Sequence, residues 1–443
     1  MIYLILIFAT LIRLVIINQS FWLDEAASLM AARVPLTDFV NYLSHDFHPP
    51  LYYLLLHFWL KFGLYQESFL RLLSVIFGVL TVYVLYHWLL EALDNKKIAL
   101  VAALLLAVNP FHIYYSQELR PYVLNAFLSL LSWLFLFRFL KAQKKLSLVL
   151  FILVSALNYY TFYGAFFNLL GQLVFVIIYY RRHLLSVLTA SFASLLLFLP
   201  WLPTLMLQLR SGSSMETILP GWSVTSGLSS FKSLALIPLK FATGRINLNG
   251  QPTYQIVAAL VCLYLFLFIL LSLRQRFARH LLVAFATPIL IAFVVSFQFP
   301  SLGYWRYLFL LPFFLTFIAL GLSSLPRPYF LFNLIFTTLV FIFLNLIFWF
   351  TPTFQREDWR SALNHIQSTS ALGSISVFAF PDAFAPVFWY APALKYVAPL
   401  KDFANTDLTT IDLSLSQATT SHQQIFYFDY LTALSDPDHR LRL

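Results

Sequence analysis

Residues 329–350 read YFLFNLIFTTLVFIFLNLIFWF, a run that contains no Asp, Glu, Lys or Arg. A helix of about 20 such residues is long enough to cross the hydrocarbon core of a bilayer. The whole chain shares this character, because 60% of its 443 residues are hydrophobic and 10% are charged, against roughly 45–50% and about 25% in soluble domains. The sequence therefore predicts an integral membrane protein.

Apolar runs of similar length recur along the chain up to residue 350, and they predict an all-α polytopic membrane protein with about 11 transmembrane helices. The predicted spans are residues 2–17, 69–90, 98–113, 121–140, 146–162, 164–180, 184–203, 253–273, 281–299, 307–325 and 329–350. The first run lacks a basic segment before it and a small-residue cleavage site after it. We therefore expect a retained span and not a removed signal peptide.

The net charge of +10 is unevenly distributed. Residues 1–350 contain 22 Lys and Arg against 9 Asp and Glu, whereas residues 351–443 contain 6 against 9. Basic residues concentrate in the short cytoplasmic loops of membrane proteins, and alternate connections carry eleven of them. They are Lys96, Lys97, Lys141, Lys144, Lys145, Arg181, Arg182, Arg274, Arg276, Arg279 and Arg327. This pattern predicts a multi-pass protein of the cell membrane with a cytoplasmic N-terminus and an extracytoplasmic tail.

Several function classes lack support in the sequence. The 12 glycines form no G-x-G-x-x-G or Walker-type loop, which argues against a nucleotide-binding domain. Cys262 is the single cysteine, so neither an internal disulfide framework nor a cysteine-based metal site is expected. The basic excess is explained by topology, so no nucleic-acid partner is predicted.

Two outer loops are long, residues 18–68 and 204–252, and the tail from residue 351 changes character. Within the first loop, residues 51–60 are apolar but too short to span, which indicates a helix at the membrane interface. In the tail, residues 357–367 have helical apolar spacing, whereas 375–380 and 425–428 read as strands. The sequence thus predicts a transmembrane domain over residues 1–350 and a small extracytoplasmic α/β domain over residues 351–443.

Acidic residues are rare in the membrane part, and an ionised group near hydrocarbon is costly enough to suggest a function. Asp24, Glu25, Asp38, Asp46 and Glu118 all fall in the first two outer connections. Asp24 and Glu25 follow an aromatic Phe-Trp anchor, and adjacent residues of a helix point about 100° apart. We therefore expect different roles, one acid facing a substrate and the other tied to a cation. The simpler structural interpretation is capping of a helix N-terminus.

Two further outer segments carry candidate site residues. Asp46 and His48 stand before the rigid Pro49-Pro50 pair, where they could position substrate or bind a divalent metal ion. Glu118, Arg120 and Tyr122 lie in the next outer connection, and the planar guanidinium of Arg120 suits a phosphate.

Arg306 begins the tenth predicted span and is a second candidate for contact with phosphate. The simpler interpretation of Arg306 is an arginine that extends its charge to the membrane surface. The simpler interpretation of Arg120 is a salt bridge at the membrane interface.

In their order, these segments resemble the protein O-mannosyltransferase superfamily, in its bacterial branch of polytopic glycosyltransferases with the GT-C fold (glycosyltransferase family 39-like). The resemblance extends to about residue 365, and its fragments are specific in combination. They are residues 21–26 (FWLDEA), 46–56 (DFHPPLYYLLL), 71–74 (RLLS) with Gly78, 115–122 (YSQELRPY), 200–203 (PWLP), 304–307 (YWRY) and 356–360 (REDWR).

The resemblance implies transfer of a sugar from a polyprenyl-phosphate-linked donor to a protein, lipid or cell-surface glycan on the outer face of the membrane. Asp24 would be the catalytic carboxylate that activates the acceptor, with Glu25 supporting it, and Arg120 and Arg306 would bind the donor phosphate. Asp46, His48, Glu118 and Tyr122 remain candidates for positioning substrate or a metal ion. No certain cofactor is predicted.

The chemistry of glycosyl transfer also calls for a carboxylate base and for cations at the phosphate. Attack of an acceptor hydroxyl on an anomeric carbon needs a base and a cation that stabilises the departing phosphate. Phosphate is a good leaving group, so direct displacement with inversion needs no second acid of the glycosidase kind.

Two rival functions fit the sequence less well. A flippase for lipid-linked sugars would place ionisable groups in mid-membrane and show symmetric halves. A nucleotide-sugar transferase would rest on Asp436-Pro437-Asp438, which is better read as a turn.

Overall fold

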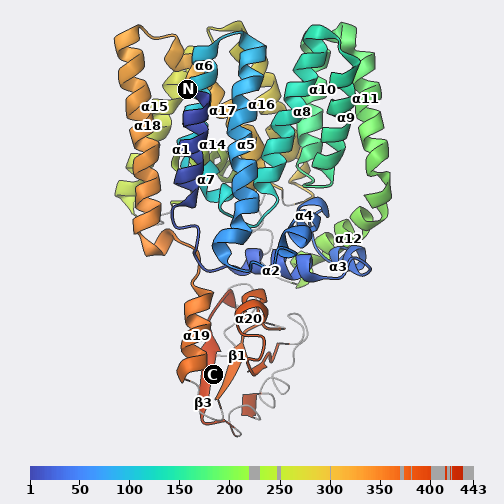
Figure 1. The fold of residues 1–443 in the computed structure, drawn as a ribbon, viewed down its shortest axis with the longest axis vertical. Coiled ribbons are helices and arrows are strands. Elements are labelled where there is room, and N and C mark those ends of the chain that lie inside the picture. Colours follow the sequence, from blue (N-terminus) through green and yellow to red (C-terminus); the bar gives the residue numbers. More distant parts are fainter. Residues whose placement is uncertain are drawn as a thin grey trace. The chain divides into compact units, whose positions relative to one another are not determined.

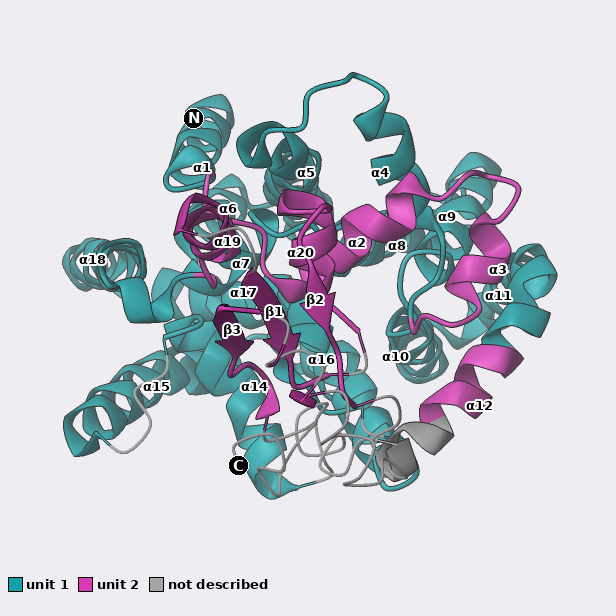
Figure 2. Ribbon diagram, turned by 90° about the horizontal axis from the view of Figure 1, so that it is seen from below, with its two compact units in different colours: residues 1–17, 48–205, 227–355 teal, residues 18–47, 206–226, 356–443 magenta. Residues whose placement is uncertain are grey.

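The computed structural model describes residues 1–218, 230–246, 251–299, 301–369, 374–380, 382–400, 415–416, 420 and 422–432. They fall into two compact units (Figure 2). The first unit comprises Met1–Ile17, His48–Leu205 and Gly227–Gln355, and the second comprises Asn18–Phe47, Met206–Ser226 and Arg356–Leu443. Each unit is described by itself.

The first unit is helical throughout, and its long helices run side by side (Figure 1). Its helices are α1 (Ile2–Leu14), α4 (Leu51–Leu60), α5 (Glu67–Leu93), α6 (Lys96–Val108), α7 (Pro110–Ser116), α8 (Tyr122–Ala142), α9 (Lys145–Tyr159), α10 (Ala165–Tyr179), α11 (Leu184–Phe198), α14 (Phe231–Thr243), α15 (Pro252–Ser272), α16 (Arg276–Val295), α17 (Leu311–Ser323) and α18 (Arg327–Phe350). Short 3₁₀ segments are η1 (Arg181–His183), η2 (Leu199–Trp201), η3 (Tyr304–Leu310) and η4 (Pro352–Phe354).

Every predicted span contains a helix. Among the described residues, seven helices are long and apolar enough to cross a membrane, and an eighth span is formed if α6 and α7, bent by 61°, count as one. The shorter apolar helices α1, α9 and α10 occupy the other three predicted spans. These observations confirm the expected class of an all-α polytopic membrane protein.

Small and polar residues bring the helices of this unit together. A side chain at Gly321 of α17 would place its Cβ 2.0 Å from the Phe268 carbonyl oxygen of α15, so only glycine fits there. Between α8 and α10, Trp133 Nε1 donates to Asn168 Oδ1 at 2.9 Å, and Gln172 Nε2 donates to Ser132 Oγ at 2.7 Å. Close backbones and interhelical hydrogen bonds are the usual means of packing helices in lipid.

The loop predicted over residues 204–252 is largely helical in its described part. Helix α12 (Leu202–Ile218) continues directly from η2, and α14 follows Ser230. Leu205, Met206 and Leu209 continue a helical apolar spacing that the neighbouring Ser and Gly residues obscure in the sequence.

The second unit contains a small parallel sheet and short helices. Its elements are α2 (Leu23–Arg33), α3 (Phe39–Leu43), most of α12, α19 (Trp359–Thr369), β1 (Ser374–Phe378), α20 (Ala385–Tyr390), β2 (Tyr396–Val397) and β3 (Gln424–Phe428). The strand order is β2-β1-β3, with both pairs parallel, and Ser376 of β1 stands opposite Tyr396 and Phe426. The predicted helix and both predicted strands of the tail are therefore present.

The core of the second unit explains why residues 18–47 belong to it and not to the helical unit. Trp359, Phe378 and Phe384 form the centre of this core, and Leu23 of α2 packs against it. Phe21 N also donates to Tyr390 OH at 2.8 Å. The unit that includes the tail thus holds the first half of the long outer loop, including Asp24 and Glu25.

Candidate functional site

The acidic pair opens helix α2 in the second unit. Asp24 and Glu25 both lie in the first turn, where a negative charge interacts favourably with the helix dipole. Glu25 is fully buried, and its Oε2 lies 3.6 Å from Nε of the buried Arg356. Asp24 is half-buried. Glu25 therefore has the cation-bound role that one of the two acids was expected to have, and Asp24 is the more accessible carboxylate.

Residues 356–360 hold this turn in place. Arg360 N donates to Ser20 Oγ at 3.0 Å, and Arg356 Nη1 contacts Gln19 Oε1 at 3.3 Å. Glu357 accepts from Tyr430 OH at 2.8 Å. Burial, and after it the carboxylates of Glu357 and Asp24, raise the pKa of Tyr430, so this phenol stays a neutral donor. Residues 356–360 (REDWR) are one of the segments that carry the family resemblance, but the sequence predicted no role for them. The four charged residues around a tryptophan were the available signal.

In the second unit, Asp46 makes a hydrogen bond within the loop that contains it. Its Oδ1 accepts from Phe47 N at 2.6 Å. Burial, and next the Asp46 carboxylate, raise the pKa of the Tyr42 phenol. These contacts fit a loop-stabilising role, and its predicted part in substrate or metal binding stays a prediction.

In the first unit, His48, Arg120 and Tyr122 are brought together as the sequence suggested. Arg120 Nη2 lies 3.2 Å from His48 Nε2 and 3.5 Å from Tyr122 OH. A guanidinium only donates, so His48 Nε2 is the acceptor and the imidazole is neutral. The His48 ring stacks on Phe162 with centroids 6.0 Å apart and meets Tyr53 and Tyr122 edge-on. The aromatic rings thus fix the direction in which Arg120 points.

Arg306 joins the same group. It lies in η3, is half-buried, and interacts electrostatically with Tyr122, Tyr307 and Arg120. Two arginines that repel each other across one tyrosine form a site suited to an anion.

Two further cations, which sequence reasoning missed, lie at the end of α14. Arg245 donates to Tyr304 OH, its guanidinium lies 5.2 Å from the Tyr114 ring centroid, and it interacts electrostatically with Glu118. Lys240 is 5% exposed, and its Nζ donates to Ile246 O at 2.8 Å. Burial, and after it the charge of Arg245, lower the pKa of Lys240 to about 8. Lys240 and Arg245 were visible as two cations five residues apart, but the loop matched no motif.

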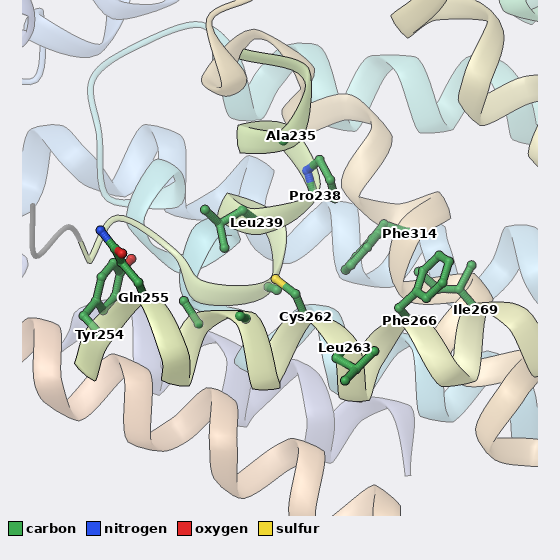
Figure 3. Close-up of a pocket in the computed structure, with 13 residues that line it drawn as sticks. Ala235, Pro238, Leu239, Tyr254, Gln255, Cys262, Leu263, Phe266, Ile269 and Phe314 are labelled. Carbon is green, nitrogen blue, oxygen red and sulfur yellow. The ribbon is translucent and has the colours of Figure 1, made fainter. Parts of the chain in front are cut away.

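An apolar cavity of about 640 Å³ lies between α14 and α15 (Figure 3). Pro238 and Leu239 line one side, Cys262 and Phe266 the other, and Phe314 of α17 also contributes. Tyr254 and Gln255 are at the polar end, and Tyr254 OH donates to Ile246 O at 2.6 Å. Because Lys240 donates to the same carbonyl, the polar end of the cavity adjoins the cations.

The sequence leaves open whether Asp46 and His48 bind a divalent metal ion, and this alternative stays a prediction. Within the described part of the chain, no group of three or more His, Cys, Asp or Glu side chains is arranged to hold an ion. The Asp436-Pro437-Asp438 segment lies outside the described residues.

Comparisons with known proteins give a partial match to one family and a fold. Residues 47–206 match the family model described as dolichyl-phosphate-mannose-protein mannosyltransferase. No curated protein sequence matches the chain.

Similar solved structures include those of two proteins. ArnT from Cupriavidus metallidurans is 11% identical over 97% of this chain and 90% of its own, with TM-scores of 0.60 in the apo state and 0.61 bound to undecaprenyl phosphate. The oligosaccharyltransferase AglB from Archaeoglobus fulgidus, in complex with an inhibitory peptide and a dolichol-phosphate, is 14% identical over 94% of this chain and 68% of its own, with a TM-score of 0.53.

At these identities the solved structures establish the fold, and the family model covers the segment that contains His48, Arg120 and Tyr122. Both agree with the recognition made from the sequence motifs. The chain is therefore a polytopic membrane protein with the GT-C fold, and its residues 47–206 are similar to the dolichyl-phosphate-mannose-protein mannosyltransferase family.

Proposed function

We propose that this protein transfers a hexosyl or pentosyl group from a polyprenyl-phosphate-linked donor to a protein, lipid or cell-surface glycan on the outer face of the membrane. The observation that carries the proposal is the junction of the apolar cavity with Lys240 and Arg245. A polyprenyl phosphate has the same two parts, a long apolar chain and an anionic head.

The apolar part of the site suits the isoprenoid chain. The cavity is lined mainly by carbon, and each methylene buried there contributes about 0.8 kcal/mol. Most of its lining residues come from α14 and α15, and Tyr254 near the start of α15 marks the polar end. ArnT and AglB, which share the fold, have been solved with undecaprenyl phosphate and a dolichol-phosphate respectively, and this supports a carrier of the same class here.

The cationic part suits the phosphate. Arg245 and Lys240 gather around Tyr304, while Arg120 and Arg306 gather around Tyr122. Guanidinium groups form paired hydrogen bonds with phosphate oxygens and keep their charge. We assign these cations to recognition of the donor and to stabilisation of the charge that develops on the leaving phosphate.

One base and these cations are sufficient for a single displacement at the anomeric carbon. The acceptor oxygen forms a bond to the anomeric carbon while the bond from that carbon to the phosphate oxygen breaks. The electron pair goes to the phosphate, and the acceptor proton goes to the Asp24 carboxylate. A single displacement inverts the anomeric configuration. The buried Glu25–Arg356 pair then holds the turn that presents Asp24.

The test of the donor site is binding of undecaprenyl phosphate to purified protein in nanodiscs. Arg245→Gln and Lys240→Ala should each weaken binding about tenfold to a hundredfold, because each removes a charged hydrogen bond worth roughly 1.5–3 kcal/mol. Arg274→Gln and Lys232→Ala are matched controls, since both residues are exposed.

The proposal expects near-normal binding in these two control variants. Equal affinity of all four variants and the wild type would refute the assignment of the donor phosphate site.

A further inference from the structure

Arg13 is a fully buried arginine near the end of α1, in the first predicted span. Its guanidinium donates to Ala9 O at 2.8 Å and Ala107 O at 3.0 Å, and it meets His112 Nδ1 at 2.7 Å. It also reaches Leu106 O at 3.4 Å and Ser116 Oγ at 3.2 Å. Its hydrogen-bond partners among the described residues include no carboxylate. A buried cation among neutral groups is costly, so its retention calls for a function.

The contacts of Arg13 lie at the break between α6 and α7. Pro110 has no N–H, so the bend of 61° leaves the last carbonyls of α6 without helical donors. Arg13 supplies donors to the carbonyls of Leu106 and Ala107, and Asn345 Nδ2 donates to that of Val108 at 3.0 Å. Backbone groups within a membrane need such partners. The bend is therefore a defined structure with its hydrogen bonds supplied by side chains.

Helix α7 is attached to α1 at several successive points. Ser116 Oγ receives the Arg13 bond, and Gln117 Nε2 donates to Arg13 O at 2.8 Å and Val15 O at 2.7 Å. Gly78 of α5 permits this approach, because a Cβ there would lie 2.3 Å from Ser116 Oγ. These contacts fix both the position and the rotation of α7.

The same helix carries residues of the proposed donor site. Tyr114 lies beneath the Arg245 guanidinium, and the chain reaches Glu118 and Arg120 directly after α7 ends. Ser74 Oγ donates to Glu118 O at 2.6 Å, which holds the following turn against α5. A rotation of α7 would therefore move Tyr114 and the following turn that carries Arg120.

We propose that Arg13 and His112 are positioning residues that set the rotation of α7 and thereby aim Tyr114 and Arg120 at the donor phosphate. The pair requires a neutral imidazole, since Arg13 only donates and Nδ1 must accept. This inference rests on the proposed function for its consequence in catalysis, whereas the attachment of α7 can be measured without any substrate.

The kinetic test compares His112→Leu, which has no acceptor, with His112→Asn, whose side-chain oxygen can accept from Arg13. His112→Leu and Arg13→Met should lower kcat/KM for the donor by about tenfold to a hundredfold, because small misplacements cost that much. The KM for the acceptor should stay unchanged, and His112→Asn should recover most of the loss. Arg138→Met is the control, because the ion pair of Arg138 with Glu91 joins α8 to α5.

The second measurement is hydrogen–deuterium exchange of the wild type and Arg13→Met. Exchange should rise in residues 109–121 and stay unchanged in α9 and α10. Unchanged exchange in residues 109–121 would overturn the inference, whatever the kinetics show. Raised exchange with unaltered donor kinetics would also overturn it, because the pair would then be merely structural. A wild type that uses no polyprenyl-phosphate donor would refute the proposed function, and the exchange result would still decide whether the pair holds α7.

Discussion

Asp24 and Glu25 are neighbours in the chain but lie in different environments. Glu25 is fully buried beside Arg356, whereas Asp24 is half-buried at the same helix start. Removing one partner from a buried pair leaves an uncompensated charge, so Glu25 is needed for folding of the turn. Asp24 is therefore the residue at which chemistry and structure can be separated by mutation.

Asp24→Asn should lower the transfer rate by about a hundredfold to ten-thousandfold, the usual contribution of a general base. The variant should keep the thermal unfolding temperature of the wild type, because asparagine has nearly the size and shape of aspartate and this side chain is only half-buried. Asp38→Asn, an exposed acid of the same loop, is the control and should retain full activity. Near-normal transfer by folded Asp24→Asn would show that another group accepts the proton.

Lys240 gives the donor site a dependence on pH. Burial and Arg245 lower its pKa to about 8, so Lys240 is charged below that pH and loses its charge as the pH rises through it. The value of kcat/KM for the donor, which reports the free enzyme, should therefore fall above about pH 8. In Lys240→Arg the charge persists, and the alkaline fall should be absent. The same alkaline fall in both proteins would rule out Lys240 as a phosphate ligand.

At the scale of elements, contacts between helices depend on particular small residues. Gly321 of α17 faces the backbone of α15 at Phe268, the helix that lines the apolar cavity. A bulkier residue there would have to separate two helix backbones. A backbone cannot move aside as a flexible side chain can. The shape of the cavity therefore depends on a glycine that does not line it.

Gly321→Ala should destabilise the protein by about 1–3 kcal/mol, as overpacking usually does. The change should appear as a lower thermal unfolding temperature and weaker binding of undecaprenyl phosphate. Gly212→Ala is the matched control, because its Cβ would lie 3.9 Å from the nearest atom. Equal unfolding temperatures of Gly321→Ala and wild type would contradict the close packing.

The helices were predictable because hydropathy acts locally, whereas the contacts that join distant segments were not. The predicted span over residues 98–113 contains the Asn109-Pro110 pair, and the structure places a bend there. Nothing in the sequence near Leu23 indicated that it packs on the core around Trp359. Arg120 and His48 were found because they stand in short aromatic motifs, while Arg245 lies in a loop without one. Sequence pattern thus predicts elements, and long-range packing completes the site.

For the whole molecule, the distribution of charge predicts how the chain crosses the membrane. Lys141, Lys144 and Lys145 mark a cytoplasmic loop, and the tail from residue 351 carries a negative balance. A reporter that is active only outside the cytoplasm should work after residue 350 and fail after Lys144. The reverse pattern would invert the topology and would place the site on the side opposite to the one proposed.

The central claim is that the protein uses a polyprenyl-phosphate-linked sugar as donor. Its most direct test is release of the carrier phosphate from synthetic polyprenyl-phosphate sugars, measured by mass spectrometry, in proteoliposomes with an extract of cell-surface acceptors. The account predicts that wild type releases polyprenyl phosphate and forms a glycosylated product of inverted configuration, and that Arg245→Gln and Asp24→Asn do neither at a comparable rate. No release by wild type from any donor tested, or equal release by both variants, would contradict it.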